Sequence, residues 1–488
     1  NTMNKKHLTI LHSNDLHGDF LAEKIDEKLV GGVSLLSGYI NKVRAEEDNV
    51  IYAIAGDMFR GSVIDSEYKG ISTIEIMNAI APDVVSIGNH EADYGFSHLL
   101  FIEKCAKFPI INANLHIKTN GARLFQPYKI IEIGGMKILF IGIITEEVLA
   151  SAKKEGLIGT IINTAAAAEE IGKICNAHNG IDIDFTVVLT HIGWQEDHNL
   201  AALLDPSWGV DVIIGGHSHT FIEQPDFVNG IAIVQAGTGT DGIGRFDLEI
   251  DTDNNCLVDY KWQYIPINND TCPVDHQIEE LICNYKNDTD KKYGRVVCKF
   301  LDVLTHPSRL QETELGNLVA DIFQQSLGVD VALVGSGSIR VEQAGPIITF
   351  GKLSEIYPYG GKQYLIKVTA DTLRKMLLYI NREDNFINHG EYYQLSKGIN
   401  FIYSKSKHDF IKCTLNGEEL IGDRIISVAL SEFHFSNIKD FLGIDPQEYE
   451  KNGAARVIAT NDFDLLVEYL SNCNIVDSNV EGRMVLVD

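Results

Sequence analysis

Short apolar runs alternate with amphipathic segments along roughly the first 250 residues of the chain. Several of these runs are strand-like, because they are brief and rich in Val, Ile, Leu and Thr; they are residues 8–11, 50–54, 84–87, 186–189 and 212–214. Apolar residues recur at helical spacing over 33–43 and again over 74–80, each time before the next strand-like run. Alternation of this kind predicts a layered α/β domain.

Side chains that can ligate a metal ion lie at or just beyond the ends of these strand-like runs. They are Asp15, His17, Asp57, Asn89, His191, His217 and His219. We expect neighbouring strand ends in a buried sheet to gather these side chains at one edge. Oxygen and imidazole ligands together suit manganese, zinc or a similar divalent ion. The motifs contain no cysteine, which argues against a structural zinc site with thiolate ligands. The pattern therefore indicates a two-metal hydrolytic site.

Each motif alone has an ordinary explanation. A single Asp-x-His after a strand is more often a polar loop pair than a ligand set. The segment Gly215-Gly216-His217-Ser218-His219 is more specific, since glycines allow close backbone approach and two imidazoles leave on one side. All the motifs in order, each after a strand-like run, favour the metal site.

A polar, turn-rich break divides the chain near residue 270, where Asn268-Asn269-Asp270 and Pro273 occur. A helical pattern over about 275–286 follows it. The rest again mixes strand-like and helical patterns. We therefore predict a first domain over 3–270, a linker with a helix over 271–294, and a second α/β domain with its own core over 295–488.

Composition limits the classes of partner. The chain has 488 residues, 45% hydrophobic and 22% charged, which is typical of a globular protein of more than one domain. Its 41 basic and 68 acidic residues give a net charge of −27, which disfavours a nucleic acid polymer or an anionic membrane as partner. No apolar run reaches the roughly 18 to 20 residues that span a bilayer. A small anionic substrate remains compatible with a locally positive, metal-loaded cleft.

The eight cysteines lie far apart and form no CxxC pair, a pattern typical of free thiols in a reducing compartment. The N-terminal residues show no apolar segment followed by a small-residue cleavage site. We therefore expect a cytoplasmic location.

The motif series resembles that of the calcineurin-like metallophosphoesterases, and more finely their two-domain 5'-nucleotidase branch. The matching segments are Asn14-Asp15-Leu16-His17-Gly18, Gly56-Asp57, Gly88-Asn89-His90-Glu91, Thr190-His191 and Gly216-His217-Ser218-His219. The resemblance implies a four-layer αββα catalytic domain followed by a smaller α/β domain.

The resemblance also implies roles for residues of the first domain. Asp15, His17, Asp57 and His219 would hold one ion, and Asn89, His191 and His217, with Asp57 as a bridge, would hold the other. His90 would donate to a phosphoryl oxygen or the leaving group, and Asp93 would fix its tautomer. Asn114 also resembles a family loop position, although capping of a polar loop explains it equally well.

In the second domain the resemblance assigns substrate recognition. Arg309 and Arg340 match phosphate-binding arginines, whose planar guanidinium suits a terminal phosphate. Tyr359 and Phe433 match the two rings between which the family stacks a base. Each could instead be an ordinary surface or core residue. Segment 459–463 also looks like an aromatic family motif, but it lies too near the C-terminus to align.

Two departures from the family affect substrate specificity. Members usually carry Asn where this chain has Gly335, and a ribose-binding carboxylate where it has Lys439, unless Asp440 takes that place after a one-residue shift. A lysine there would favour a more anionic substrate.

The leading prediction is hydrolysis of nucleoside 5'-monophosphates. The alternatives are a 2',3'-cyclic nucleotide phosphodiesterase, a nucleotide-sugar or phosphoanhydride hydrolase, a sulfur-ester hydrolase, and a nucleotide-binding protein without turnover.

Overall fold

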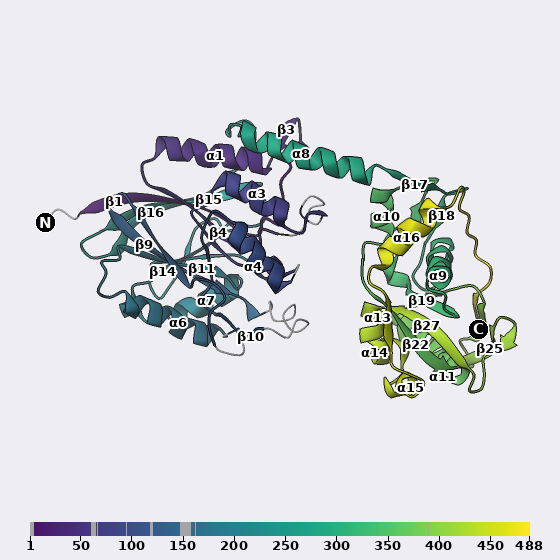
Figure 1. Cartoon of the computed structure of the whole chain (residues 1–488). Coiled ribbons are helices and arrows are strands. Elements are labelled where there is room, and N and C mark those ends of the chain that lie inside the picture. The colour runs from purple at the N-terminus through teal and green to yellow at the C-terminus, as the bar shows by residue number, and fades with distance from the viewer. Residues whose placement is uncertain are drawn as a thin grey trace. The chain divides into compact units, whose positions relative to one another are not determined.

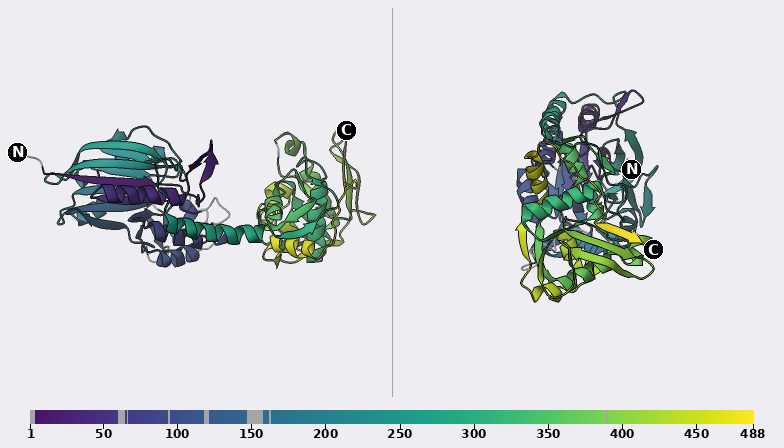
Figure 2. Two further views of the ribbon diagram at one scale, coloured as in Figure 1. Left: turned by 90° about the horizontal axis from the view of Figure 1, so that it is seen from above. Right: turned by 90° about the vertical axis from the view of Figure 1, so that its right-hand side faces the viewer.

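The computed structural model describes residues 4–59, 65, 67–93, 95–117, 121–146, 158–161, 163–388 and 390–488. The chain forms two compact units, unit 1 over Asn1–Thr289 and unit 2 over Asp290–Asp488. The division falls inside helix α8 (His276–Tyr293), which is drawn as one continuous helix in Figure 1 and in the left view of Figure 2. The helix predicted over 275–286 therefore continues to residue 293.

Unit 1 contains two six-stranded sheets. The first has the order β16 (Cys256–Pro266), β15 (Gly242–Asp251), β1 (Lys5–Ser13), β4 (Val50–Ala55), β5 (Val84–Ser86), β6 (Ile110–Ile111). The second has the order β13 (Asp226–Val228), β14 (Ile231–Gln235), β12 (Val212–Gly215), β11 (Phe185–His191), β9 (Met136–Ile144), β8 (Tyr128–Ile133). Strands β1, β4, β5 and β6 run parallel to one another, as do β9, β11, β12 and β14. Their carboxyl ends therefore meet at one edge of each sheet.

Helices cover the outer face of each sheet (Figure 1). On the first sheet lie α1 (Val33–Glu46), α3 (Ile71–Ile80), α4 (Phe96–Cys105) and the start of α8. On the second sheet lie α6 (Thr164–Ala177) and α7 (Trp194–Leu203). These layers confirm the four-layer αββα arrangement. Smaller elements complete the unit: β2 (Glu23–Ile25), β3 (Lys28–Val30), η1 (Asn89–Ala92), β7 (Leu115–Ile117), β10 (Ile158–Ile161) and η3 (Pro206–Trp208).

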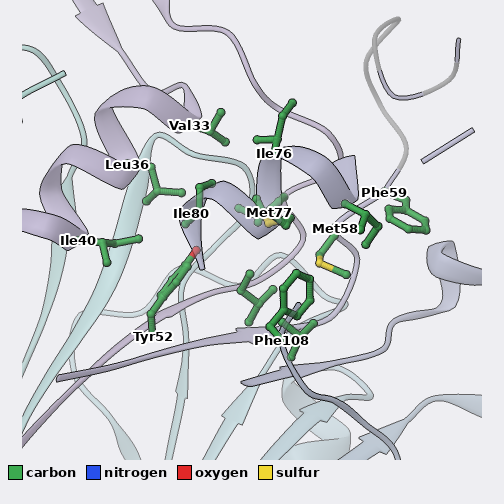
Figure 3. Packing of buried hydrophobic residues seen from close by; sticks show 14 of the residues in the cluster. Val33, Leu36, Ile40, Tyr52, Met58, Phe59, Ile76, Met77, Ile80 and Phe108 are labelled. Carbon is green, nitrogen blue, oxygen red and sulfur yellow. The ribbon is translucent and has the colours of Figure 1, made fainter. Parts of the chain in front are cut away.

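Alternation within the strands builds three cores in unit 1. In β4, Ile51 and Ala53 face the second sheet, whereas Tyr52 and Ile54 face the helices. Figure 3 shows Tyr52 below Ile40 of α1 and Ile80 of α3, in a cluster that also contains Met77 and Phe108. Strands buried on both faces read as continuous apolar runs, as the sequence of β4 does.

Unit 2 is a smaller mixed α/β domain. Its central sheet has the order β23 (Tyr393–Leu395), β19 (Val331–Gly335), β27 (Ile425–Ser431), β22 (Gln363–Thr369), β28 (Arg456–Ala459), and a second sheet has the order β26 (Glu418–Glu419), β25 (Asp409–Leu415), β24 (Ile399–Ser404), β29 (Met484–Val487). Two further pairs join β17 (Val296–Lys299) to β21 (Ile347–Thr349) and β18 (Leu304–Thr305) to β20 (Gln343–Ala344).

The helices of unit 2 pack against these strands (Figure 1). They are α9 (Glu314–Leu327), η4 (Ser336–Ser338), α10 (Phe350–Ile356), α11 (Ala370–Ile380), α12 (Glu383–Ile387), α13 (Glu432–Ser436), α14 (Ile438–Leu442), α15 (Gln447–Glu450) and α16 (Asp462–Ser471). Within the described parts of both units, no helix is long and apolar enough to cross a membrane.

Candidate metal centre

The seven predicted ligands lie at the carboxyl ends of parallel strands in unit 1. His191 is the last residue of β11, and the others follow the ends of β1, β4, β5 and β12 within a few residues. Backbone hydrogen bonds join the loops of the first sheet: the Asp15 N–H donates to Gly56 O at 3.0 Å, and the His17 N–H donates to Asp57 O at 3.0 Å. The strand topology therefore brings together residues that are 202 positions apart in the sequence, such as His17 and His219.

Ligand atoms approach one another in three overlapping groups. The groups are Asp15 with His17 and His219, His17 with Asp57 and His90, and Asp57 with His191 and His217. Within each group the ligand atoms lie within 4.8 Å of one another. Asn89 joins the third group, because its Oδ1 lies 3.1 Å from His217 Nδ1. Asp57 is shared between two groups, which is the arrangement that a bridging carboxylate requires.

The donor atoms fit a bound cation. Asp15 Oδ1 is buried without a hydrogen-bond partner, although His219 Nε2 lies 3.3 Å and His17 Nε2 3.6 Å away. The Nε2 atoms of His17 and His219 face each other at 3.1 Å. Buried polar atoms that lack a partner are rare in folded proteins and need an explanation. A cation between these atoms would satisfy them together.

The orientation of His191 supports the same interpretation. Its Nδ1 lies 2.7 Å from the carbonyl oxygen of Ala55, the last residue of β4, so this nitrogen donates and the contact links the two sheets. Its Nε2 is buried without a hydrogen-bond partner and lies 2.9 Å from Asp57 Oδ2. Metal-binding imidazoles commonly donate one nitrogen to a carbonyl and direct the other at the ion.

Five of the seven predicted ligands have positive φ: Asp15 (52°), His17 (49°), Asp57 (58°), His217 (84°) and His219 (54°). Residues with a side chain seldom adopt this left-handed conformation, and strain of this type concentrates at functional sites. The strained backbone thus coincides with the residues that the sequence predicts to bind metal.

Glycines allow the loops to meet. A Cβ at Gly88 would lie 2.2 Å from Asp57 Oδ1, and a Cβ at Gly216 would lie 2.5 Å from Ala55 O. Any larger residue at either position would displace a ligand loop.

Neighbouring side chains hold Asp15 in place. Asn14 Nδ2 donates to Asp15 Oδ2 at 2.6 Å, and the backbone N–H of His217 donates to the same oxygen at 2.9 Å. Burial alone would raise the pKa of Asp15, but the nearby imidazole of His17, the charge of His191 and the Asn14 and His217 donors lower it below its usual range. Asp15 is therefore a carboxylate that can bind a cation.

Glu91 is a supporting residue to which the sequence analysis gave no role. Its buried Oε1 accepts hydrogen bonds from the backbone N–H of Asp57 at 2.6 Å and of Gly88 at 3.0 Å. Burial, followed by the nearby charge of Asp57, raises the pKa of Glu91 to about 8. Its position next to Asn89 and His90 is the local signal in the sequence, but the role of Glu91 depends on a contact with Asp57, 34 residues away in the sequence.

His90 and Asp93 form a pair at the edge of this cluster. His90 Nδ1 lies 2.7 Å from Asp93 Oδ2, and the two side chains are 36% and 11% exposed. The hydrogen bond with Asp93 raises the pKa of His90 despite the opposing effect of burial. The ring centroid of His90 lies 5.3 Å from that of His17. The imidazole is therefore fixed next to the ligand cluster and open to solvent.

Asn114 has a structural role that its hydrogen bonds explain. Its Nδ2 donates to Ile144 O at 2.8 Å, and its Oδ1 accepts from the Ile144 N–H at 2.9 Å. The side chain is buried and ties its loop to the end of β9.

In unit 2 the two predicted phosphate-binding arginines approach one turn, η4. A Cβ at Gly337 would lie 3.0 Å from Arg309 Nη1, and Arg340 Nη1 donates to Gly337 O at 3.3 Å. Both side chains are exposed. Two exposed guanidinium groups at one turn can receive an anion.

The two predicted stacking rings lie at one end of the β22–β27 pair. Tyr359 precedes β22 and is 48% exposed, while Phe433 lies in α13 directly after β27 and is 58% exposed. Gln363, the first residue of β22, pairs with Ser431, the last residue of β27. Both rings are therefore available to a ligand.

The two departures from the family have structural counterparts. A Cβ at Gly335 would lie 2.1 Å from His434 Nε2, so the buried His434 ring fills the space into which a side chain at 335 would extend. Lys439 Nζ lies 3.3 Å from Asp445 Oδ1, and both side chains are well exposed.

Comparison with known proteins agrees with this geometry. The family model of the calcineurin-like phosphoesterases matches residues 8–221, and that of the 5'-nucleotidase C-terminal domain matches residues 296–442. A snake venom 5'-nucleotidase from Naja atra is 27% identical over 531 residues, covering 98% of each chain. A 5'-nucleotidase from Mus musculus is 26% identical and covers 98% of this chain and 90% of its own.

Solved structures share the fold. A 5'-nucleotidase precursor from Thermus thermophilus is 23% identical, with a TM-score of 0.59 and coverage of 99% of this chain and all of its own. A putative 5'-nucleotidase from Staphylococcus aureus is 16% identical, with a TM-score of 0.64 and similar coverage.

Unit 1 is thus a calcineurin-like metallophosphoesterase domain, a class that implies divalent metal ions. With its second domain, the chain belongs to the two-domain 5'-nucleotidase family of phosphoric ester hydrolases.

Proposed function

We propose that this chain hydrolyses nucleoside 5'-monophosphates to a nucleoside and inorganic phosphate. The observation that carries the proposal is the convergence of seven oxygen and imidazole ligands, including the partnerless Asp15 Oδ1 and His191 Nε2, at the strand ends of unit 1. The relatives named 5'-nucleotidase, aligned over 98% of the chain, support the substrate class.

In this proposal the ligands divide between two ions as the resemblance to the family implies. Asp15, His17, Asp57 and His219 would hold one, and Asn89, His191, His217 and the shared Asp57 would hold the other. Mixed oxygen and nitrogen donors without thiolate suit manganese, zinc or a similar ion. When bound, such a pair supplies Lewis acidity that makes water nucleophilic near neutral pH and offsets the charge of the phosphoryl oxygens.

His90 completes the centre from the protein side. Asp93 accepts a hydrogen bond from Nδ1 and thereby orients the ring, which leaves Nε2 to face a phosphoryl oxygen or the leaving group. In the doubly protonated ring, Nε2 donates to the oxygen on which negative charge develops. In this role His90 is the hydrogen-bond donor to the substrate, and Asp93 is the carboxylate that orients its ring.

Unit 2 supplies recognition in this proposal. Arg309 and Arg340 would bind a phosphate at η4, and Tyr359 and Phe433 would stack on the base. Stacking tolerates different bases, so a range of nucleosides is expected to be accepted. In the alternative prediction from sequence, Lys439 attracts a more anionic substrate. The ammonium group of Lys439 is exposed, and it lies beside the carboxylate of Asp445.

A cytoplasmic location is part of the same proposal. All eight cysteines are free, and four of them are buried, which is compatible with a reducing compartment. Labelling of thiols in protein prepared without reductant, under denaturing conditions, tests this; reaction at fewer than eight thiols would contradict it.

Phosphate release tests the function directly. Chelator-stripped protein is re-supplied with manganese, zinc or magnesium and assayed on nucleoside 5'-monophosphates beside 2',3'-cyclic nucleotides and nucleotide sugars. We expect metal-dependent release from the 5'-monophosphates. His90→Ala should lower kcat by roughly 10²- to 10⁴-fold, as is usual for loss of an acid–base or electrostatic group.

The matched control is His276→Ala, which removes an exposed histidine at the start of α8 and should keep wild-type kcat. Release from the other esters alone would contradict the substrate class. Equal turnover by His90→Ala and wild type would contradict the role of His90.

A further inference from the structure

Residues 357–361, hereafter the Tyr359 segment, lie in the connection 357–362 between α10 and β22, which has no regular secondary structure. Tyr357 is buried, whereas Pro358, Tyr359 and Gly360 are exposed. An exposed ring on an irregular connection loses conformational entropy when a ligand fixes it. The Tyr359 ring can therefore stack efficiently only if other contacts already hold its backbone.

The carboxylate of Asp462 binds the chain on both sides of Tyr359, through the side chain of Tyr357 on one side and the backbone of Gly361 on the other. Asp462 Oδ2 accepts a hydrogen bond from Tyr357 Oη at 2.6 Å, and Oδ1 accepts from the Gly361 N–H at 3.1 Å. The Asp462 N–H in turn donates to Gly361 O at 2.9 Å. Tyr357 and Gly361 lie two residues before and two residues after Tyr359, so Asp462 fixes the segment at both ends.

The same carboxylate reaches toward the second ring. Asp462 Oδ2 also accepts from Gln363 Nε2 at 2.9 Å, and Gln363 pairs with Ser431 of β27. The next residue along, Glu432, donates its N–H to Lys362 O at 2.9 Å, and Phe433 follows. One network of hydrogen bonds therefore sets the positions of both chain segments that carry the rings.

Burial makes this network selective. Asp462 is 1% exposed and begins α16, where a negative charge is favourable. A buried carboxylate whose donors come from one loop and its neighbouring strand enforces a single loop geometry, because each donor left unmatched is costly.

We propose that Asp462 is a positioning residue that pre-organises Tyr359 for stacking on the nucleobase. The inference rests on the proposed nucleotidase function and deepens it. It gives a role to segment 459–463, which the sequence pattern alone could not align with the aromatic motif of the family. Asp462 acts through Tyr359 and has no contact with the reacting phosphate in this assignment.

The test compares a substrate that has a base with one that lacks it. Asp462→Asn keeps the side-chain shape but removes the charge and places a donor against the hydroxyl of Tyr357. We expect KM for adenosine 5'-monophosphate to rise about five- to tenfold, on the order expected for weakened charge-assisted hydrogen bonds. KM for ribose 5-phosphate should change less than about twofold on the same basis, because that substrate has nothing to stack.

A second comparison separates positioning from general destabilisation. In a Tyr359→Ala background, Asp462→Asn should raise KM for adenosine 5'-monophosphate no further, since the ring that it positions is absent. Asp464→Asn, an exposed residue in the same first turn of α16, is the matched control and should behave as wild type. Tyr357→Phe removes a single hydroxyl and carries the test if Asp462→Asn fails to fold; we expect a smaller rise in the same direction.

Equal rises of KM for both substrates, or a full effect of Asp462→Asn in the Tyr359→Ala background, would overturn the inference alone. Wild-type KM in a folded Asp462→Asn or Tyr357→Phe variant would do the same. Wild-type protein that releases no phosphate from any nucleoside monophosphate would instead overturn the proposed function, together with the inference that rests on it.

Discussion

The positive φ of five proposed metal ligands has an energetic consequence. Each left-handed residue with a side chain costs on the order of 1 to 3 kcal/mol. The sheets on either side keep these conformations in place, since Asp15 and Asp57 are buried and bonded to loops from neighbouring strands. These left-handed conformations place carboxylate and imidazole atoms at the short separations that a cation requires. The packing of unit 1 therefore offsets the cost of the strain and keeps the centre pre-formed.

Gly335 illustrates how one position changes the binding region of unit 2. Its neighbour His434 is 1% exposed, lies 2.7 Å from Tyr393 Oη through Nδ1, and has a pKa lowered to about 4 by burial. The ring is therefore neutral near pH 7 and packed in place. A family-type asparagine at 335 would need the space that this ring occupies.

Gly335→Ala tests that packing. The new Cβ would lie 2.1 Å from His434 Nε2, and overpacking of this kind costs about 1 to 3 kcal/mol. For a unit of this size we expect the melting temperature of unit 2 to fall by roughly 2 to 4 °C per kcal/mol, measured by circular dichroism. In a His434→Ala background the same substitution should cost little; an equal loss in both backgrounds would contradict the overlap.

At the scale of elements, the sequence predicted what depends on local pattern. The strand-like runs before Asp15, Asp57 and Asn89 are strands β1, β4 and β5, and their parallel order brings the ligands together. This was predictable because period and strand-end position are local properties of the sequence.

Roles that arise from distant contacts were not predictable in the same way. Glu91 and Asp462 act through hydrogen bonds to backbone or side chains 34 and about a hundred residues away, respectively. No spacing rule reports such a contact, and the left-handed φ values likewise follow from loop packing. The true end of α8 at Tyr293 also exceeds the predicted end at 286, because its polar C-terminal half has little apolar periodicity.

Helix α8 offers a test at this scale. Ile278 and Ile282 of its first half are buried in the core that includes α1 and α3, and Tyr285 Oη donates to Glu75 Oε2. We expect Ile282→Ala to leave a cavity that costs about 2 to 5 kcal/mol. Hydrogen exchange of the amides in 276–289 should accelerate, while exchange in the central sheet of unit 2 stays unchanged.

Cys283→Ala, an exposed neighbour on the same helix, is the control and should leave exchange at its wild-type rate. Unchanged exchange in Ile282→Ala would show that the first half of α8 does not depend on this core.

At the scale of the whole molecule, the net charge of −27 and the acidic residues of the predicted metal centre both favour the binding of divalent cations. An acidic protein attracts divalent cations and repels polyanions, so metal loading is favoured and large nucleic acids are disfavoured. In the centre itself, two buried aspartates are opposed mainly by histidines, and added cations would compensate that charge.

Metal removal should therefore destabilise unit 1 selectively. Ligand binding to the folded state adds RT ln(1 + [L]/Kd), about 2.7 kcal/mol at a hundredfold excess over Kd. We expect chelator-stripped protein to melt several degrees lower than protein re-supplied with manganese or zinc. Tryptophan fluorescence isolates this transition, because the three tryptophans of the chain, Trp194, Trp208 and Trp262, all lie in unit 1.

The shared carboxylate makes the metal test specific. Asp57→Asn should lose most of the metal-dependent rise in melting temperature, since Asp57 belongs to two of the three ligand groups. Asp259→Asn, on the exposed side of β16, is the control and should keep the full rise. Because removal of a buried charge can itself stabilise the metal-free protein, the comparison is between the metal-induced shifts and not between absolute temperatures. A full shift in Asp57→Asn would contradict a bridging role, and equal shifts in unit 1 and unit 2 would indicate nonspecific cation binding in place of a built site.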